Sequence, residues 1–374
     1  MGELVIAGAG HAHMQLMGAI PELIADGHRV TVIGPDERHY YSGMGPGMLG
    51  GIYRPVEISL PVKSIVESLG GSFVLGKVAR IDPYKRMVIL EAGQEFPYDV
   101  LSCNLGSFVP SHLADKVNTD VYTVKPIQNL LQARIRIREI VSERPVRIGI
   151  CGGGPAALEI AGNAWSAARE QGRFGVKIKI FTGSEFLHNL PDRVRNLAVK
   201  SLNKRRIQIV QGSYVEHVTT GNVILQNGQH YEQDIIFLAL GVKPSKVFAA
   251  SDLSTGKDGG LKVNRYLQSV SHPEIFGGGD CIWFEPNPLD KVGVYAVRQN
   301  PVLVHNVRAQ LEGSSLKSFD PGGSYLLIFN IGGGKGILHK NGLSFGGPLA
   351  FRIKDYIDRK FVKQFKVNRH HKLS

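Results

Sequence analysis

Two glycine-rich turns constrain the fold of this chain more than any other feature of its sequence. The first turn, GAG at residues 8–10, follows the apolar run LVIA, and the second, GGG at residues 152–154, follows the run IGIC. Glycine lets the main chain approach a pyrophosphate closely, and the amino terminus of the helix that follows favours negative charge. One such turn is weak evidence, but two in one chain predict two bound nucleotides.

The segments around both turns follow the same order of elements. A helix at 11–26 and a strand at 29–33 are expected after the first turn, and a helix at 155–170 and a strand at 176–181 after the second. Each half then closes on an acid, several apolar residues and a glycine, at 98–107 and 234–241. Strand, helix and strand in this order form parallel βαβ units. The predicted fold class is α/β, with two Rossmann-like nucleotide-binding domains.

One of these domains is expected to be inserted in the other. A strand at 275–276 enters a further glycine turn that carries Asp280, and a helix at 292–309 follows it. The chain therefore returns to its first half after completing the second. We predict a first nucleotide-binding domain from 1–125 and 246–320, a second from 126–245, and a small α+β region from 321–374.

The composition is that of an ordinary globular protein. Of the 374 residues, 43% are hydrophobic and 20% are charged, which is enough for two or three domains. No apolar run reaches the roughly 18 residues that a membrane span requires, and no basic segment with a cleavage site precedes the first strand. We therefore expect a cytoplasmic protein.

The three cysteines, Cys103, Cys151 and Cys281, stand apart from one another in the sequence. They form no C-x-x-C pair and have no histidines at metal-ligand spacing. We expect no metal site and no structural disulfide, and we predict that the three thiols are buried as small hydrophobic side chains.

The formal net charge of +12 is concentrated in three stretches, at 134–147, 200–206 and 352–372. Basic stretches serve anionic membranes or phosphorylated cofactors, or are simply solvated faces. No nucleic-acid motif accompanies them, so nucleic-acid binding is not expected. In the last stretch, apolar residues recur at helical spacing among the basic ones. This pattern predicts an amphipathic helix that either packs on the core or lies on an anionic membrane surface, at the cytoplasmic face.

Residues 40–51, YYSGMGPGMLGG, show neither helical nor strand periodicity. Glycine and proline interrupt every regular pattern there, which predicts a loop held close to a ligand. Such a loop is suited to border a flat apolar channel.

The complete order of these features resembles the FAD-dependent pyridine nucleotide-disulfide oxidoreductase superfamily, whose two nucleotide domains are of the glutathione-reductase type. Four segments are most similar to its type II NADH dehydrogenase (NADH:quinone oxidoreductase) branch: YSGM at 41–44, VKP at 124–126, YAVRQN at 295–300 and KDYIDR at 354–359. The likeness covers nearly the whole chain. It implies FAD as the cofactor, NADH or NADPH as the substrate, and a quinone or another small molecule as the electron acceptor.

The resemblance also implies which residues hold the FAD. The first turn would hold the pyrophosphate, Asp280 would bond the ribityl or pyrophosphate region, and the helix that begins near Tyr295 would face the flavin pyrimidine ring. The implied FAD residues are Gly8, Gly10, His11, Ala12, Asp36, Ser42, Gly43, Val78, Gly106, Gly279, Asp280, Tyr295 and Arg298.

The implied nicotinamide-nucleotide site is built on the second turn. Its proline suits the first position of a helix, where the missing N–H has no intrahelical partner. The implied residues are Gly152, Gly154, Pro155, Ala156, Glu159 and Gly241.

The chain departs from the family pattern at two kinds of position. His13 replaces the third glycine of the first turn, and we expect a packed or solvent-reaching histidine there rather than a catalytic one. The acid that bonds the ribose hydroxyls is missing after both strands. Asp36 or Glu37 is the expected substitute in the FAD site. The second strand ends in Thr182 and Gly183, so the choice between NADH and NADPH stays open.

Residues 1–102 contain no cysteine, so a dithiol relay beside the flavin is not expected. The remaining chemistry is hydride transfer from a nicotinamide to FAD and electron delivery to a quinone-type acceptor. For these steps the protein orients the reactants and supplies the electrostatic field around the flavin. We expect Gln299 to line the acceptor side and Lys125 to contact the flavin or a substrate.

Two alternatives stay open at this stage. One is an FAD-binding electron-transfer or regulatory subunit that needs a protein partner, and the other is a sulfide:quinone reductase-like enzyme. The sequence gives no oligomeric state.

Overall fold

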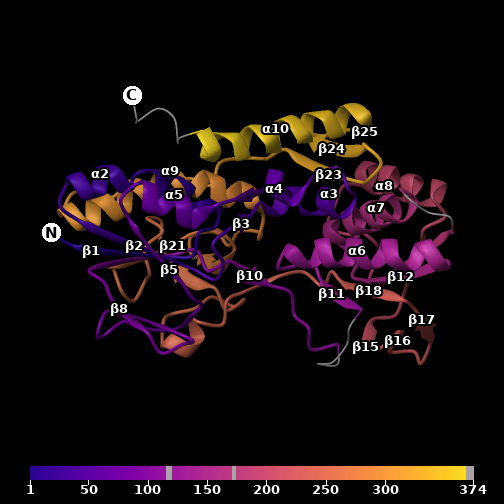
Figure 1. The fold of residues 1–374 in the computed structure, drawn as a ribbon, viewed down its shortest axis with the longest axis horizontal. Helices are drawn as coiled ribbons and strands as arrows, with labels where there is room; N and C mark the ends of the chain where they lie inside the picture. The colour runs from indigo at the N-terminus through magenta and orange to yellow at the C-terminus, as the bar shows by residue number, and fades with distance from the viewer. Residues whose placement is uncertain (115–119, 171–173, 368–374) are drawn as a thin grey trace.

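The computed structural model describes residues 1–114, 120–170 and 174–367 and contains two five-stranded parallel sheets side by side (Figure 1). The first sheet has the strand order β21-β9-β1-β2-β5, so strands from both ends of the chain share it. The α/β prediction and the return of the chain are confirmed. The strands of this first sheet are β1 (Glu3–Ala7), β2 (Arg29–Gly34), β5 (Ser72–Leu75), β9 (Val100–Cys103) and β21 (Ile275–Gly277).

The second sheet repeats this arrangement with the order β11-β18-β12-β13-β14. The central strands of both sheets are buried along nearly their whole length, because helices or meanders cover both faces. Along the chain this sheet begins with β11 at Val121, ahead of residue 126, which we predicted as the start of the second domain. Its strands are β11 (Val121–Thr123), β12 (Val146–Cys151), β13 (Val176–Thr182), β14 (Gln208–Gln211) and β18 (Ile235–Leu238).

A three-stranded antiparallel meander precedes β9 in the first half and β18 in the second. The sequence predicts strands at 76–81, 86–90, 214–218 and 223–225, which are the longer strands of both meanders. It does not predict β8 and β17, which have only three residues each. The strands are β6 (Val78–Asp82), β7 (Met87–Leu90) and β8 (Glu95–Pro97) in the first half, and β15 (Val215–Thr219), β16 (Asn222–Leu225) and β17 (His230–Glu232) in the second.

The sequence predicts long helices at 126–143, 155–170, 192–204 and 292–309, and four helices of the structure confirm them within a few residues. They are α6 (Gln128–Glu143), α7 (Pro155–Arg169), α8 (Asp192–Lys204) and α9 (Gly293–Glu312). The helix predicted at 11–26 is instead divided into η1 (His11–His13), α1 (Met14–Gly18) and α2 (Ile20–Ala25). Pro21 stands at the start of α2, and its missing N–H and fixed ring interrupt a continuous helix.

The prediction of a loop at 40–51 is wrong for most of that segment. Residues Ser42–Met44 form the 3-10 helix η2, and Gly45–Leu49 form α3. The glycines permit close packing: a Cβ on Gly47 would lie 2.4 Å from the Tyr53 ring. Met44, Met48 and Leu49 are buried, so packing on the core replaces the periodicity that the sequence lacks.

The remaining elements are short and connect the larger ones. They are β3 (His39–Tyr40), α4 (Pro55–Ile58), β4 (Ser59–Leu60), α5 (Val62–Ser68), β10 (Ser107–Phe108), β19 (Lys243–Pro244), η3 (Ala249–Ser251), β20 (Leu261–Val263), η4 (Gly279–Cys281) and β22 (Ile282–Phe284).

The C-terminal region is a small sheet covered by a long helix, α10 (Pro348–Val367), which runs along the top of the molecule in Figure 1. Ala350 and Val362 are buried on the core, whereas Leu349, Tyr356 and Ile357 are exposed. Residues 368–372 of the predicted basic tail lie outside the described residues, within which no helix is long and apolar enough to cross a membrane. The strands are β23 (Leu327–Asn330), β24 (Gly336–Lys340) and β25 (Leu343–Gly347).

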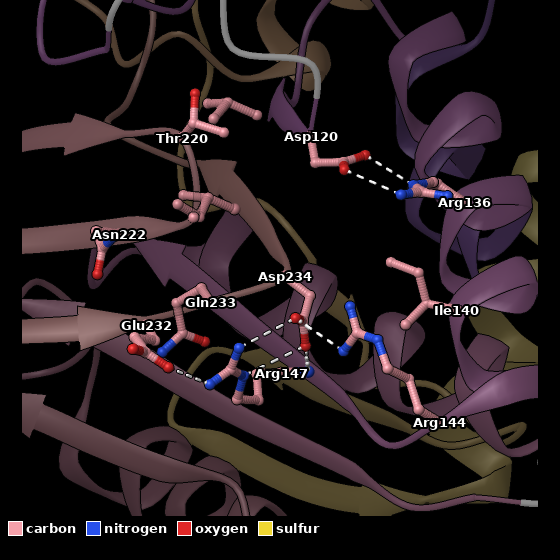
Figure 2. Close-up of a pocket in the computed structure, with 13 residues that line it drawn as sticks. Asp120, Arg136, Ile140, Arg144, Arg147, Thr220, Asn222, Glu232, Gln233 and Asp234 are labelled. Atoms are coloured by element: carbon pink, nitrogen blue, oxygen red, sulfur yellow. Dashed lines mark hydrogen bonds and ion pairs between the residues drawn. The ribbon is translucent and has the colours of Figure 1, made fainter.

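A network of ion pairs lies at the amino-terminal edge of the second sheet, around a cavity of about 390 Å³ (Figure 2). Asp234 accepts hydrogen bonds from the backbone N–H of Arg147 at 2.6 Å and from Nη1 of Arg144 at 2.9 Å. Burial opposes ionisation, but these bonds hold the pKa of Asp234 below its usual value. Each of the three arginines here, Arg144, Arg147 and Arg136, has a carboxylate partner. The charges around the cavity are therefore balanced, and the cavity lies at the edge opposite to the one where open α/β sheets bind ligands.

We predict that Asp234→Asn lowers the free energy of unfolding by about 2 kcal/mol, because it leaves two guanidinium groups without their shared, buried partner. The measurement is urea unfolding followed by circular dichroism at pH 7. Glu232→Gln is the matched control, since its carboxylate bonds the same Arg147 but its side chain is 73% exposed, and exposed pairs contribute little. Equal losses in the two variants would contradict the prediction.

Candidate functional site

The two glycine turns are built in the same way at the carboxyl ends of β1 and β12. The N–H of Gly8 donates to the carbonyl of Ile33, and the N–H of Gly152 donates to the carbonyl of Phe181, both at 2.8 Å. The first glycine of each turn has a positive φ, +91° and +131°. A Cβ there would lie 2.2 Å from the carbonyl oxygen of Asn104 or Ala239, so only glycine fits.

Asn104 follows β9 and brings two other glycines together. Its side-chain amide would lie 2.6 Å from a Cβ on Gly10 and 2.7 Å from a Cβ on Gly279. Its Nδ2 is buried and has no partner among the described residues. A donor without a partner beside a glycine turn suits a phosphate oxygen. Asn104 is not among the residues predicted from the sequence, although its position directly after a parallel strand is a signal for such a site.

Asp280 lies in a small polar cluster beside this turn. Its Oδ2 accepts hydrogen bonds from Nζ of Lys125 and Oγ of Ser107, both at 2.8 Å. Lys125 precedes a cis proline and also donates to Ser107 at 2.8 Å. Burial acts to raise the pKa of Asp280, but Lys125 and Ser107 hold it below its usual value. The structure thus joins two residues that the sequence placed near the flavin.

His11 lies in an aromatic cluster on the other side of the turn. Its ring stacks on Phe361 of α10 with centroids 5.7 Å apart, and lies 4.9 Å from the ring of Tyr41. Burial lowers the pKa of His11 to about 4, although Asp280 opposes the shift. The imidazole is therefore neutral at pH 7. His39 completes the cluster, with a buried Nε2 that has no partner within the described ranges.

Helix α10 is tied to residues 41–53 by three polar contacts. Tyr41 Oη donates to Asp358 at 3.0 Å, Tyr53 Oη donates to Asp355 at 2.8 Å, and Lys354 Nζ donates to the carbonyl of Gly43 at 2.8 Å. Burial raises the pKa of Asp358, and Lys354 opposes this shift. The segments at 41–44 and 354–359, which are far apart in sequence, are thus direct neighbours.

The early turns of α9 do not present Gln299 as expected. The side chain is 1% exposed, and its Oε1 accepts a hydrogen bond from the N–H of Gly279 at 2.7 Å. Asn300 accepts a hydrogen bond from the N–H of Gln15 at 3.0 Å and donates to the carbonyl of His11. These amides therefore hold the turns in place, and in this structure Gln299 is not open to an acceptor.

The other implied FAD residues, except Arg298, lie near the carboxyl edge of the first sheet. Ala12 is buried in η1, Gly106 follows β9 with φ +68°, and Val78 begins β6. Asp36 is exposed just beyond β2, where the ribose acid is expected, and accepts a hydrogen bond from Gln128 at 3.1 Å. Ser42 lies in η2.

Arg298 donates to carbonyls of Pro321 and Gly323. Tyr295 packs against Tyr325 and also lines a small pocket with Gly279 and Asp280. Both side chains secure the segment after α9.

The second turn leads into an unobstructed helix start. Gly154 caps α7 with Pro155 at its first position, and a Cβ on Gly154 would meet no atom within 4 Å. Gly241 follows β18 with φ +82°. Ala156 lies in the first turn of α7. These residues surround open space at the carboxyl edge of the second sheet, as a nucleotide site requires.

Glu159 lies one turn further along α7 and faces the C-terminal sheet. Its Oε1 accepts a hydrogen bond from the N–H of Asn330 at 2.7 Å. Burial raises the pKa of Glu159 to about 7, while Lys354 opposes the shift. In this structure the carboxylate therefore connects α7 with β23.

Residues 2–310 match the family model described as pyridine nucleotide-disulphide oxidoreductase. The chain belongs to this family. Two curated relatives are similar: ferroptosis suppressor protein 1 of Taeniopygia guttata, 28% identical over 76% of this chain and 75% of the relative, and type II NADH:quinone oxidoreductase of Staphylococcus saprophyticus, 26% identical over 96% and 95%. The solved sulfide:quinone oxidoreductase of Aquifex aeolicus shares the fold, with a TM-score of 0.79, 17% identity and coverage of 98% and 92%.

This pyridine nucleotide-disulphide oxidoreductase has no reactive dithiol among its described residues. Cys103, Cys151 and Cys281 are all buried and free, as predicted. Burial raises the pKa of all three thiols, to about 12 for Cys151 and Cys281. Since the thiolate is the reactive form, these side chains are inert near neutral pH.

His13 is a packed histidine that joins the first turn to β9. Its Nδ1 lies 2.5 Å from the carbonyl oxygen of Gly8, and its Nε2 lies 2.8 Å from Oγ of Ser102. Burial lowers its pKa to about 4, and the bond to Gly8 opposes the shift. The imidazole therefore takes the structural place of the missing third glycine.

We predict that His13 contributes to acid sensitivity. It is neutral in the folded protein but protonates in the unfolded chain below about pH 6.5, so its stabilising contribution is lost as the pH falls from 6.5 toward 4, by up to about 3 kcal/mol. His13→Gln should flatten this part of the curve of unfolding free energy against pH, measured on the flavin-loaded protein. His230→Gln, at an exposed position, should leave the curve unchanged. A curve of wild-type slope for His13→Gln would refute the assignment.

Proposed function

We propose that this chain is a flavoprotein that takes a hydride from NADH or NADPH onto FAD and passes electrons to a quinone-type acceptor without a redox disulfide. The observation that carries the proposal is the pair of glycine turns with the same geometry on two separate sheets. Family membership and the type II NADH:quinone oxidoreductase relatives support it, and so do the three inert thiols.

Each group near the first turn has a distinct task in this proposal. Bound FAD supplies the redox chemistry. Gly8, Gly10 and the free Nδ2 of Asn104 hold the pyrophosphate, and the pair of Lys125 and Asp280 fixes the adjoining part of the cofactor. Gln299 and Asn300 position the turns from behind.

The second turn orients the nicotinamide nucleotide. The open space beside Gly154 receives its pyrophosphate at the amino terminus of α7, whose dipole favours negative charge. Thr182 ends β13 in place of an acid, and the next acid, Glu185, is paired with Arg195 at 2.8 Å. No carboxylate at the end of β13 therefore opposes a 2′-phosphate, so either coenzyme is compatible with the site.

We also propose the domain division expected from the sequence, with the boundary at 125 moved ahead of β11, since that strand belongs to the second sheet. The chain before β11 and residues 246–320 would bind FAD, the segment from β11 to residue 245 would bind the nicotinamide nucleotide, and 321–374 would form the cover. The acceptor would approach beneath α10, where the rings of His11, Tyr41 and Phe361 gather. Flat aromatic side chains suit a flat quinone ring.

The first experiment is an anaerobic visible spectrum of the purified protein. We expect a bound-flavin band that NADH or NADPH bleaches and that a short-chain quinone restores. The coenzyme that bleaches it faster identifies the physiological donor. Absence of a flavin band would overturn the proposal.

The variant Gly154→Ala tests the nicotinamide-nucleotide site independently of the flavin site. The added methyl group meets no protein atom, so the variant should fold and keep its flavin, yet need at least tenfold more nicotinamide nucleotide for bleaching because the methyl group occupies space beside the pyrophosphate. Gly175→Ala is the control, since that position is equally open. Equal behaviour of both variants would count against the second site.

A partner-dependent electron-transfer subunit is the second candidate function. It predicts stable reduction of the flavin by a nicotinamide with no turnover on any quinone. The sulfide:quinone reductase-like alternative is disfavoured by the buried thiols, whose high pKa values leave no thiolate for sulfide chemistry.

We further propose that the outer face of α10 lies on an anionic membrane surface at its cytoplasmic side. Leu349, Tyr356 and Ile357 are 61%, 67% and 42% exposed on this helix. Exposed basic residues, Lys360 and Lys363, flank them. Apolar side chains with basic neighbours on one helix face are typical of interfacial helices.

We predict that replacing Leu349, Tyr356 and Ile357 together by serine weakens binding to vesicles containing phosphatidylglycerol at least tenfold in a sedimentation assay, because three apolar side chains lose their place in the interface. The flavin content should be unchanged, since the inner face of α10 is intact. Replacing the exposed Leu75 and Tyr84 by serine is the control. Unchanged vesicle binding of the triple variant would exclude this face.

A further inference from the structure

A second large cavity, of about 540 Å³, lies between α8 and the C-terminal sheet, where α10 begins. Two of the elements around it, β25 and α8, lie at the right-hand end of the molecule in Figure 1. It is separate from both glycine turns. Residues of α7, α8, β24 and β25 line it, and none of its lining residues is an acid.

Four basic residues surround the cavity: Lys200 and Lys204 of α8, Arg205 directly after it, and Lys335 before β24. The three lysines are exposed, and no described carboxylate pairs with them. Lys200 and Lys204 are four residues apart on one helix, where like charges repel. Such a concentration of positive charge favours an anion inside the opening.

Arg205 is fixed in the wall of the cavity. Its Nη2 donates to the carbonyl of Gly332 at 3.0 Å, its Nη1 donates to that of Ile331, and its guanidinium lies 5.0 Å from the centre of the Trp165 ring. Carbonyl and ring contacts orient the cation without neutralising it. Burial lowers the pKa of Arg205, which agrees with a cation that lacks a counter-ion.

Apart from Ser201 and three glycines, the rest of the lining is apolar. Trp165, Leu197 and Ile337 contribute to it, and Pro348 places the start of α10 in the wall. The positive end of this helix dipole adds to the field of the basic side chains. A small inorganic anion would leave the apolar lining unused, whereas a neutral apolar molecule would leave the cations unused.

We propose that this cavity binds the headgroup of an anionic phospholipid. The phosphate lies among Lys200, Lys204, Arg205 and Lys335, and the glycerol and the first part of an acyl chain lie against Trp165 and Ile337. Pro348 lines the cavity and the exposed Leu349 follows it directly, so the outer face of α10 begins next to the cavity wall. The proposal rests on the membrane association proposed above and adds a specific lipid site to it.

The test uses the full-length, flavin-loaded Trp283→Phe protein, in which Trp165 is the single remaining tryptophan. Dihexanoyl-phosphatidylglycerol, below its micelle concentration, is titrated while Trp165 fluorescence is recorded. Parallel titrations use dihexanoyl-phosphatidylcholine and glycerol 3-phosphate. The site variant is Lys200→Glu with Lys204→Glu, and the control is Lys77→Glu with Lys85→Glu, which makes the same change of charge at exposed lysines.

We expect saturable binding of the phosphatidylglycerol, at least tenfold weaker binding of the two other ligands, and at least a tenfold loss in the site variant alone. Equal binding of the phosphatidylcholine, or equal losses in both variants, would overturn the proposal. Equal or tighter binding of glycerol 3-phosphate would overturn it in favour of a soluble phosphate ligand.

The titration is independent of catalysis and of the outer face of α10. Flavin bleaching by NADH or NADPH should be the same in all variants, because the cavity is separate from the glycine turns. Failure of bleaching would therefore count against the proposed function, and failure of the titration against the lipid site.

Discussion

The close approach of each glycine turn to the end of a neighbouring strand is the constraint on which the structure depends. The N–H of the first glycine bonds the end of β2 or β13, and its missing side chain leaves room for the carbonyl of Asn104 or Ala239. Any Cβ there would displace the strand end. Two sheets thus offer the same edge, with helix amino termini and free donors, to two nucleotides.

The first turn also determines how distant parts of the chain meet. Asn300 of α9 donates to the carbonyl of His11 directly after it, and Gln299 accepts a hydrogen bond from Gly279 in the neighbouring turn. Lys125 reaches Asp280 of that same turn from the start of the second half. Phe361 of α10 stacks on His11. The first glycine turn and the turn at Gly279 and Asp280 therefore collect contacts from α9, from the start of the second half and from the C-terminal helix.

Much of the fold could be predicted because the spacing of apolar residues and the positions of glycine and proline indicate the same elements along most of the chain. The failures have local causes. Residues 40–51 lack periodicity because their glycines pack against side chains such as Tyr53, so tertiary contacts make them helical. Gln299 was expected to face an acceptor, but a buried N–H of Gly279 takes its oxygen. Asn104 was missed because only a neighbouring strand brings it between two glycines.

The sequence by itself determined the two glycine turns, the α/β class, the long helices and the absence of a dithiol in the first 102 residues, since these follow from residue type and local spacing. Only the tertiary structure decided which faces of α10 pack or stay exposed, that His13 bonds Ser102, and that one cavity is surrounded by four cations with no carboxylate partner in the part of the chain that the structure describes. Contacts between residues far apart in sequence leave no local pattern, because they depend on how whole sheets and helices pack.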